Sequence, residues 1–305
     1  MTQIVIIYSR FLNGVRAVYQ KRGVYFLAND NILDLAVAFL NSFRSYNPSI
    51  SLCMIPFNED IQEIMQLQSQ YDFSISQDPA VLRLCDGISL SFHDGIVGHY
   101  RKLAAWEGCF DEFIYIDSDT IVLENIDFVF DHLKEFSFLT SHSDIPQIRK
   151  FVWKESIDGT GKLTPRQLSF AANTGFVASK RACLGLSDVL RRLPAAIELS
   201  DHMELFCCEQ PFLNYLIVTS GMLYTSLHTI AQITEAWDMP RERWAGDSSG
   251  VVVRDGQIVR PKCPPTLLVH WAGEWKPTRE ENRLIPLYEL WSFYRHLTVD
   301  LHRDS

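Results

Sequence analysis

The sequence predicts an α/β fold with a mostly parallel central sheet flanked by helices and a smaller antiparallel or hairpin addition. Short apolar runs typical of buried strands alternate with amphipathic helical segments early in the chain, and the connections between them are short. The chain has 305 residues, of which 47% are hydrophobic and 21% are charged, as expected for a folded domain with a large core. No internal repeat divides it, so we expect residues 1–305 to form a single domain.

The first half of the chain contains the regular part of this pattern. A strand is predicted over residues 23–30, followed by an amphipathic helix over 31–48 that Pro48 ends, because proline cannot continue a helix. Strands and helices continue to alternate after this pair. The predicted segments are a strand at 49–57, a helix at 59–71, a short strand at 72–76, a helix at 98–109 and a strand at 112–119.

The second half of the chain is less regular. Gly159, Gly161 and Pro165 interrupt residues 142–167, which predicts a long excursion from the core. Asp255 and Gly256 provide the turn of a predicted hairpin. The other predicted segments are a strand and helix at 173–193, a helix at 209–221, the hairpin at 251–261, a strand and polar loop at 266–277, and a helix at 284–299.

Charge and cysteine content narrow the class of protein. The net charge of −9 argues against a nucleic-acid-binding groove. The seven cysteines are odd in number and irregularly spaced, which argues against a disulfide framework and favours a reducing cytoplasm. The N-terminus lacks the basic start and cleavage site of a signal peptide, and no segment has the roughly 20 apolar residues of a transmembrane helix. We therefore expect a cytoplasmic protein without a transmembrane segment, and its oligomeric state stays open.

Two carboxylates that are separated by a single residue end the predicted strand in "FIYIDSDTIVLEN". Asp117 and Asp119 would face the same way along a continuing strand and could converge on one cation. They could equally belong to a polar turn, since Asp and Ser are favoured turn residues. A third interpretation makes Asp117 the nucleophile of a haloacid-dehalogenase-type phosphatase, although Ile121 departs from that motif.

The loop "HWAGEWKP" after the late strand adds complementary chemistry. His270 can complete a mixed oxygen and nitrogen coordination shell, and Lys276 can reach a phosphate as a point charge. Gly273 would let the backbone approach a ligand closely. A single histidine at a strand end is more often structural, but its combination with the two acids favours a metal and phosphate site.

The order of these motifs resembles glycosyltransferase family 8, the group of glycogenin and the bacterial lipooligosaccharide galactosyltransferases. Five segments carry the resemblance over roughly residues 23–280: "LANDN", "HYRKLAAWEGCFDEFIYIDSD", "FAANTGF", "EQPFLN" and "HWAGEWKP". The resemblance implies a GT-A fold and a retaining transfer from a nucleotide-diphosphate sugar, with UDP-glucose or UDP-galactose as the expected donor and an unknown acceptor. It implies Mn²⁺ as the usual cation, with Mg²⁺ as the alternative.

The resemblance also implies roles for individual residues. Asp117, Asp119 and His270 would hold the metal, and Lys276 and the Gly273 backbone would contact the diphosphate. The nucleoside would meet Asn29, Asp30 and Asn31; Lys102 or Arg101 would bridge donor groups; and Asn173, Glu209 and Gln210 would face the donor sugar, with Glu209 and Gln210 as the catalytic candidates.

The same resemblance divides the expected domain into functional halves. Residues 23–125 would form the nucleotide-binding half, 126–280 the sugar and acceptor half, and 281–305 the C-terminal helix. Asn29 stands where the family often has an acid and Ile32 where it often has an aromatic residue, so contacts to the base are expected to differ. A phosphatase using Asp117, a sugar nucleotidyltransferase and a non-catalytic nucleotide-sugar binder are the alternatives.

Overall fold

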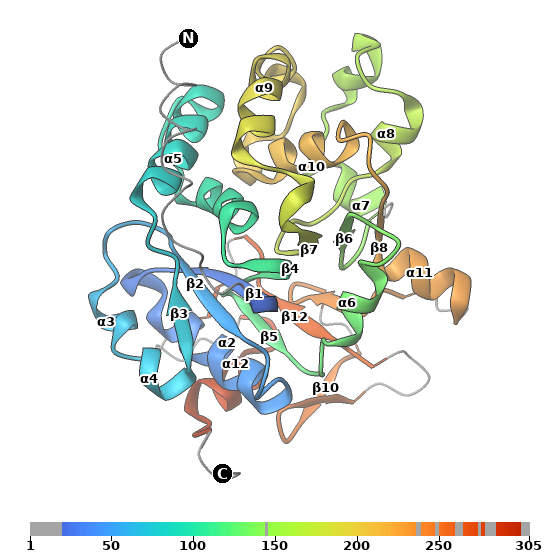
Figure 1. Cartoon of the computed structure of the whole chain (residues 1–305). Coiled ribbons are helices and arrows are strands. Elements are labelled where there is room, and N and C mark those ends of the chain that lie inside the picture. Colours follow the sequence, from blue (N-terminus) through green and yellow to red (C-terminus); the bar gives the residue numbers. More distant parts are fainter. Residues whose placement is uncertain are drawn as a thin grey trace.

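A seven-stranded sheet forms the centre of the molecule. The computed structural model describes residues 20–143, 146–235, 239–247, 250–259, 265–273, 276–277 and 285–299. The sheet has the strand order β3-β2-β1-β4-β7-β6-β8 (Figure 1). Its strands are β1 (Gln20–Ala28), β2 (Leu52–Pro56), β3 (Phe73–Ile75), β4 (Phe110–Asp117), β6 (Phe138–Thr140), β7 (Phe176–Lys180) and β8 (Tyr224–Ser226).

Strand direction divides this sheet into two parts. Strands β3, β2, β1 and β4 run parallel, as the short βα connections predict. Strand β7 is antiparallel to both β4 and β6, and β8 is parallel to β6. The predicted α/β fold with a mostly parallel sheet is confirmed. The carboxyl ends of β1 and β4 lie side by side, because Leu27 pairs with Asp117.

Helices cover both faces of the sheet. Along β1, Tyr25 and Leu27 pack into one apolar cluster with α5 and α9, and Phe26 packs with α2 on the other face. Figure 1 shows α5, α9 and α10 on one side of the sheet and α2 and α12 on the other. The helices are η1 (Asp30–Ile32), α2 (Leu33–Tyr46), α3 (Gln62–Met65), α4 (Gln68–Tyr71), α5 (Pro79–His93), η2 (Gly98–Glu107), α6 (Phe128–His132), α7 (Pro146–Arg149), η3 (Glu155–Thr160), α8 (Pro165–Ser169), η4 (Arg181–Cys183), α9 (Leu186–Ile197), η5 (Ser200–His202), η6 (Leu205–Cys207), α10 (Gln210–Val218), α11 (Leu227–Thr234) and α12 (Tyr288–His296).

Within the described residues, two small sheets accompany the central one. A three-stranded sheet has the order β5-β12-β9, formed by β5 (Thr120–Val122), β12 (Leu268–His270) and β9 (Glu242–Trp244). The predicted hairpin is confirmed as β10 (Val252–Arg254) and β11 (Gln257–Val259). Its turn residues Asp255 and Gly256 have φ values of 49° and 71°, the left-handed conformations that a two-residue hairpin turn requires.

Several segments differ from the sequence prediction. The helix predicted over 59–71 is two short helices, α3 and α4, and the helix predicted over 98–109 is the 3₁₀ helix η2. Helix α5 was not predicted, although Asp78 caps its first turn and Pro79 opens it. The predicted excursion over 142–167 was wrong, because Trp153 and Ile157 lie buried in the main core cluster.

The helix predicted over 284–299 is present in a shorter form as α12. Leu290, Trp291 and Tyr294 of α12 are buried, and α12 packs against α2, where Asn41 donates a hydrogen bond to the Tyr294 carbonyl. Each cysteine within the described ranges has a free thiol. Among the helices that the structure describes, none combines the length and apolar character needed to cross a bilayer.

Candidate functional site

Backbone pairing brings the two acids and the histidine together. Asp117 ends β4, and β5 begins immediately after Asp119. Strand β12 runs antiparallel to β5 with His270 paired to Thr120, and the Trp271 amide donates to the Asp119 carbonyl at 2.9 Å. The pairing of β12 with β5 places His270 next to Asp119, although about 150 residues separate them in sequence.

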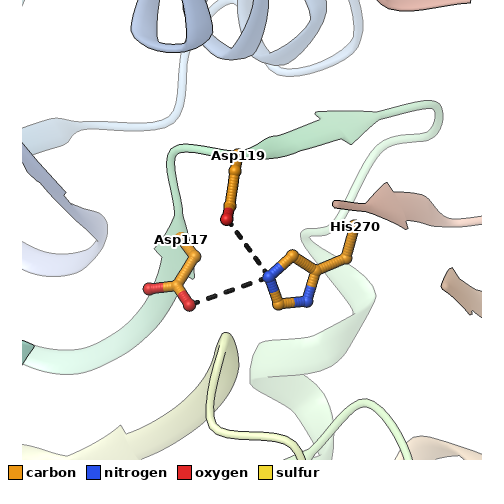
Figure 2. A group of neighbouring side chains, drawn as sticks. All are labelled: Asp117, Asp119 and His270. Atoms are coloured by element: carbon orange, nitrogen blue, oxygen red, sulfur yellow. Dashed lines mark ion pairs between the residues drawn. The ribbon is translucent and has the colours of Figure 1, made fainter. Parts of the chain in front are cut away.

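The three side chains converge on one point. His270 Nε2 lies 3.1 Å from Asp119 Oδ1 and 3.8 Å from Asp117 Oδ2. Figure 2 shows both carboxylates facing the same ring nitrogen. One ligand atom from each residue fits within 4.8 Å of the others. Asp119 and His270 are 8% and 4% exposed, so this acid–histidine trio is largely shielded from solvent.

Two further observations show that the trio fits a divalent cation. The Asp119 Oδ1 atom is buried, and the His270 Nε2 atom that lies 3.1 Å from it is itself a possible metal ligand. A cation held between these two atoms would satisfy the buried carboxylate oxygen and the ring nitrogen together. Gly175 lies so close that a Cβ there would come within 2.4 Å of His270 Cε1 and 2.9 Å of Asp117 Oδ2. Two carboxylates and an imidazole form a donor set that can hold a divalent cation.

Lys276 supplies positive charge beside the trio. Its Nζ lies 3.0 Å from Asp119 Oδ2. The Asp119 carboxylate raises the pKa of Lys276 above its usual value, so the lysine stays charged. Burial opposes ionisation of Asp119, but Lys276 and His270 outweigh it and hold the pKa of that carboxyl well below its usual range. Gly273, in the same loop, has a φ of 89°, and a Cβ added to it would meet no described atom within 4 Å, so its backbone is open to a ligand.

Lys102 connects the trio with the predicted sugar-facing residues. It is 2% exposed, and its Nζ lies 2.5 Å from Glu209 Oε1 and 3.4 Å from Asp117 Oδ1. Burial favours the neutral amine, but Asp117 and Glu209 outweigh it and raise the pKa of Lys102. Lys102 is therefore a buried cation shared by two carboxylates.

Arg101 points away from this cluster. Its guanidinium binds Asp86 at 2.8 Å and Glu59 at 2.9 Å, and it also donates to the Pro56 carbonyl. Of the two basic residues that the sequence left as alternatives, the structure places Lys102 at the site and Arg101 in a separate ion-pair network.

The predicted sugar-facing residues lie next to each other. Glu209 is 4% exposed and accepts a hydrogen bond from the Thr174 hydroxyl at 2.9 Å. Gln210 Oε1 accepts from the Thr174 amide at 3.2 Å, and its Nε2 donates to the Phe151 carbonyl at 3.1 Å. Asn173 Nδ2 lies 3.1 Å from His270 Nδ1. The segment before β7 thus joins these residues to the acid–histidine trio.

The residues predicted to contact the nucleoside directly follow β1, whose carboxyl end lies next to that of β4. Asn29 is buried, and its Nδ2 donates to Asn58 Oδ1 at 3.3 Å, whereas Asn31 is exposed. The Asp30 carboxylate accepts hydrogen bonds from the Glu63 and Ile64 amides at about 3 Å and so caps α3. The Asp30 side chain therefore has a structural role at the start of that helix.

Glu242 is a site residue that sequence reasoning missed. It is 3% exposed, and its Oε1 lies 3.0 Å from His270 Nδ1 while its Oε2 lies 2.9 Å from His142 Nδ1. The Ser141 hydroxyl also donates to Glu242. Burial opposes its ionisation, but His142 and His270 outweigh that effect and hold the pKa of Glu242 below its usual value.

Comparison with solved structures gives matches over most of the chain. The apo structure of the bifunctional glycosyltransferase WbbM matches with a TM-score of 0.58 and 13% identity over 93% of this chain; the match covers 51% of WbbM, so the chain spans about half of that protein. An active-site mutant of LgtC matches with a TM-score of 0.58 and 13% identity over 89% of this chain and 94% of LgtC. A second LgtC structure, described as a galactosyltransferase in complex with donor and acceptor sugar analogues, matches with a TM-score of 0.51 and 12% identity over 90% of this chain and 95% of LgtC.

A mammalian enzyme gives a similar result. The apo form of mouse xyloside xylosyltransferase 1 matches with a TM-score of 0.53 and 12% identity over 85% of this chain and 100% of that chain. No protein-family model and no curated protein sequence matches the chain. The GT-A-type fold implied by the resemblance is confirmed, and the chain shares the fold of these glycosyltransferases over most of its length.

Proposed function

We propose that the protein is a metal-dependent glycosyltransferase that moves a hexose from a UDP-hexose to an acceptor with retention of anomeric configuration. The observation that carries this proposal is the convergence of Asp117, Asp119 and His270 beside Lys276, at the carboxyl end of β4. Ligands of α/β sheets bind at this edge. The fold shared with solved glycosyltransferases supports the same reaction class.

Leaving-group charge is the chemical problem that such a site must solve. Cleavage of the sugar–phosphate bond leaves a nucleoside diphosphate with additional negative charge. A Mn²⁺ or Mg²⁺ ion held by the trio would supply Lewis-acid stabilisation of that charge. Lys276 would leave its ion pair with Asp119 to contact the diphosphate, and the open Gly273 backbone would approach the same group. Positive charge and N–H donors beside the diphosphate stabilise the negative charge that develops on it as the sugar–phosphate bond breaks.

The sugar side of the proposed site is built from Asn173, Glu209 and Gln210. Glu209 is held by Lys102 and Thr174, which supports a role as fixed negative charge near the reacting carbon. An oxocarbenium-like transition state is stabilised by such a carboxylate. Gln210 lies beside it and would line the face of the sugar opposite the diphosphate. This arrangement is compatible with a double displacement through Glu209 and with a same-face attack.

The nucleoside would occupy the end of β1. Asn29 and Asn31 offer amide groups there, and the Asp30 backbone lies between them. Because the Asp30 carboxylate already caps α3, we propose that its contribution is through the main chain. The side chains of Asn29 and Asn31 would then carry the polar contacts to uridine.

A donor screen tests this proposal directly. Incubation with common UDP-sugars and Mn²⁺ should release UDP slowly even without an acceptor, and a chelator should stop the release. Asp119→Asn should abolish release, because it removes a metal-binding charge at constant size. Asp131→Asn is the matched control, since Asp131 is an exposed acid paired with Lys134. Inactivity with every donor, with and without metal, would contradict the proposal, and NMR of the product anomer would test retention.

A further inference from the structure

Trp244 is an exposed indole held in a fixed orientation. It is 47% exposed, although its Nε1 donates a hydrogen bond to the Ala272 carbonyl at 3.2 Å. Its ring lies against Gly246, where a Cβ would come within 2.5 Å of the indole Cζ2. Because the indole N–H is satisfied within the protein, the apolar faces of the ring remain for a contact. Trp244 therefore presents a fixed apolar surface at the exterior of the protein.

The strand register places this indole on the face of the acid–histidine trio. Glu242 and Trp244 are two residues apart on β9, so their side chains leave the same face of the strand. Glu242 contacts His270 on that face, and Trp244 pairs in register with His270 across the parallel β9–β12 ladder. Its partner Ala272 belongs to the loop that carries Gly273 and Lys276. Trp244 thus borders the site one strand away from His270.

The strand order also shows on which side of the trio the indole lies. The predicted nucleoside residues follow β1, whereas β9 lies at the edge of the small sheet, separated from β5 by β12. Glu242 contacts His142, which follows β6, and Asn173, which precedes β7. Strand β9 therefore approaches the trio from the β6 and β7 side. The nucleoside position and Trp244 lie on different sides of the trio.

We propose that Trp244 binds the acceptor, with a pyranose ring of the acceptor sugar stacked on its indole. This inference rests on the proposed function. A pyranose has an apolar C–H face that packs on an aromatic ring, while its hydroxyl groups remain in water or bind polar groups. The position favours the acceptor over the nucleotide, because the donor extends from the end of β1 across the trio and Trp244 lies beyond it.

A binding experiment can observe this residue directly. The protein is labelled with fluorotryptophan, and the Trp244 fluorine resonance is identified by its absence from the Trp244→Phe variant. In the presence of Mg²⁺ and UDP, methyl glucopyranosides, methyl galactopyranosides or lactose should shift that resonance, and glycerol at the same concentration should not. Failure of every pyranoside to shift it, an equal shift with glycerol, or a shift with uridine alone would overturn the proposal.

Kinetics with the sugar that gives the largest shift provide the second test. Trp244→Ala should raise the KM for that sugar about tenfold, corresponding to about 1.4 kcal/mol of lost binding, and Trp244→Phe should recover most of the loss. The KM for the donor should stay within about twofold, since a factor of two is only about 0.4 kcal/mol. Phe293→Ala is the control and should leave the KM for the sugar unchanged, because Phe293 is an exposed aromatic residue on α12.

The two possible failures can be distinguished. If the donor KM rises and the acceptor KM does not change, the acceptor role of Trp244 is wrong while glycosyl transfer stands. If wild-type protein binds neither UDP nor Mn²⁺ by calorimetry, the proposed function itself fails.

Discussion

Glu242 contacts the side of the His270 ring opposite Asp117 and Asp119, with 3.0 Å between Glu242 Oε1 and His270 Nδ1. A carboxylate at this distance accepts the Nδ1 hydrogen, so that Nε2 of the neutral ring is left to bind a cation held between Asp117 and Asp119. Histidine ligands of metals commonly have such a partner, which fixes both tautomer and ring orientation. The pairing makes Glu242 a positioning residue for the proposed metal site.

Glu242→Gln should weaken Mn²⁺ binding by about 10- to 100-fold, the usual cost of losing such a partner. The amide keeps the size of the side chain but removes the charge that orients His270. Titration of free Mn²⁺ by electron paramagnetic resonance measures this without an activity assay. Glu235→Gln, an exposed residue after α11, should have no effect. An unchanged Mn²⁺ affinity in a folded Glu242→Gln protein would remove the positioning role.

Lys276→Ala should weaken UDP binding about tenfold, a loss of about 1.4 kcal/mol. The lysine is partly exposed, so solvent screening keeps the loss moderate. The affinity for uridine, which has no diphosphate, should change little. Calorimetry with both ligands in the presence of Mn²⁺ gives the comparison. Equal losses for UDP and uridine would refute a diphosphate contact.

The acids, His270 and Lys276 could be recognised from sequence because they stand in short segments beside apolar strands. Glu242 could not, because "PRERW" has no strand pattern and its contacts arise only when β9 pairs with β12. The choice between Arg101 and Lys102 also needed the structure. In the 3₁₀ helix η2 neighbouring side chains point about 120° apart, so one residue of uncertainty changes which of them faces the site.

Gly175→Ala should disrupt the trio by direct contact. The added methyl group would lie 2.4 Å from His270 Cε1 and 2.9 Å from Asp117 Oδ2, so at least one ligand must move. We expect loss of measurable Mn²⁺ binding and a decrease of about 1–3 kcal/mol in the free energy of unfolding, as for other overpacked sites. Gly159→Ala is the control, because a Cβ added there would meet no described atom within 4 Å. Normal Mn²⁺ affinity in Gly175→Ala would show that the trio is not the binding site.

Mn²⁺ binding should release about one proton near neutral pH, because a metal-bound histidine must be neutral. Burial lowers the pKa of His270 in the metal-free protein, but Asp119 and Glu242 outweigh it and raise the pKa to about 10. The ring is therefore protonated at pH 7 and must lose that proton to bind. At pH values below the raised pKa of His270, the affinity for Mn²⁺ should rise about tenfold for each unit by which the pH increases. Calorimetry in buffers with different ionisation enthalpies counts the protons, and binding that is independent of pH would show that His270 is not a ligand.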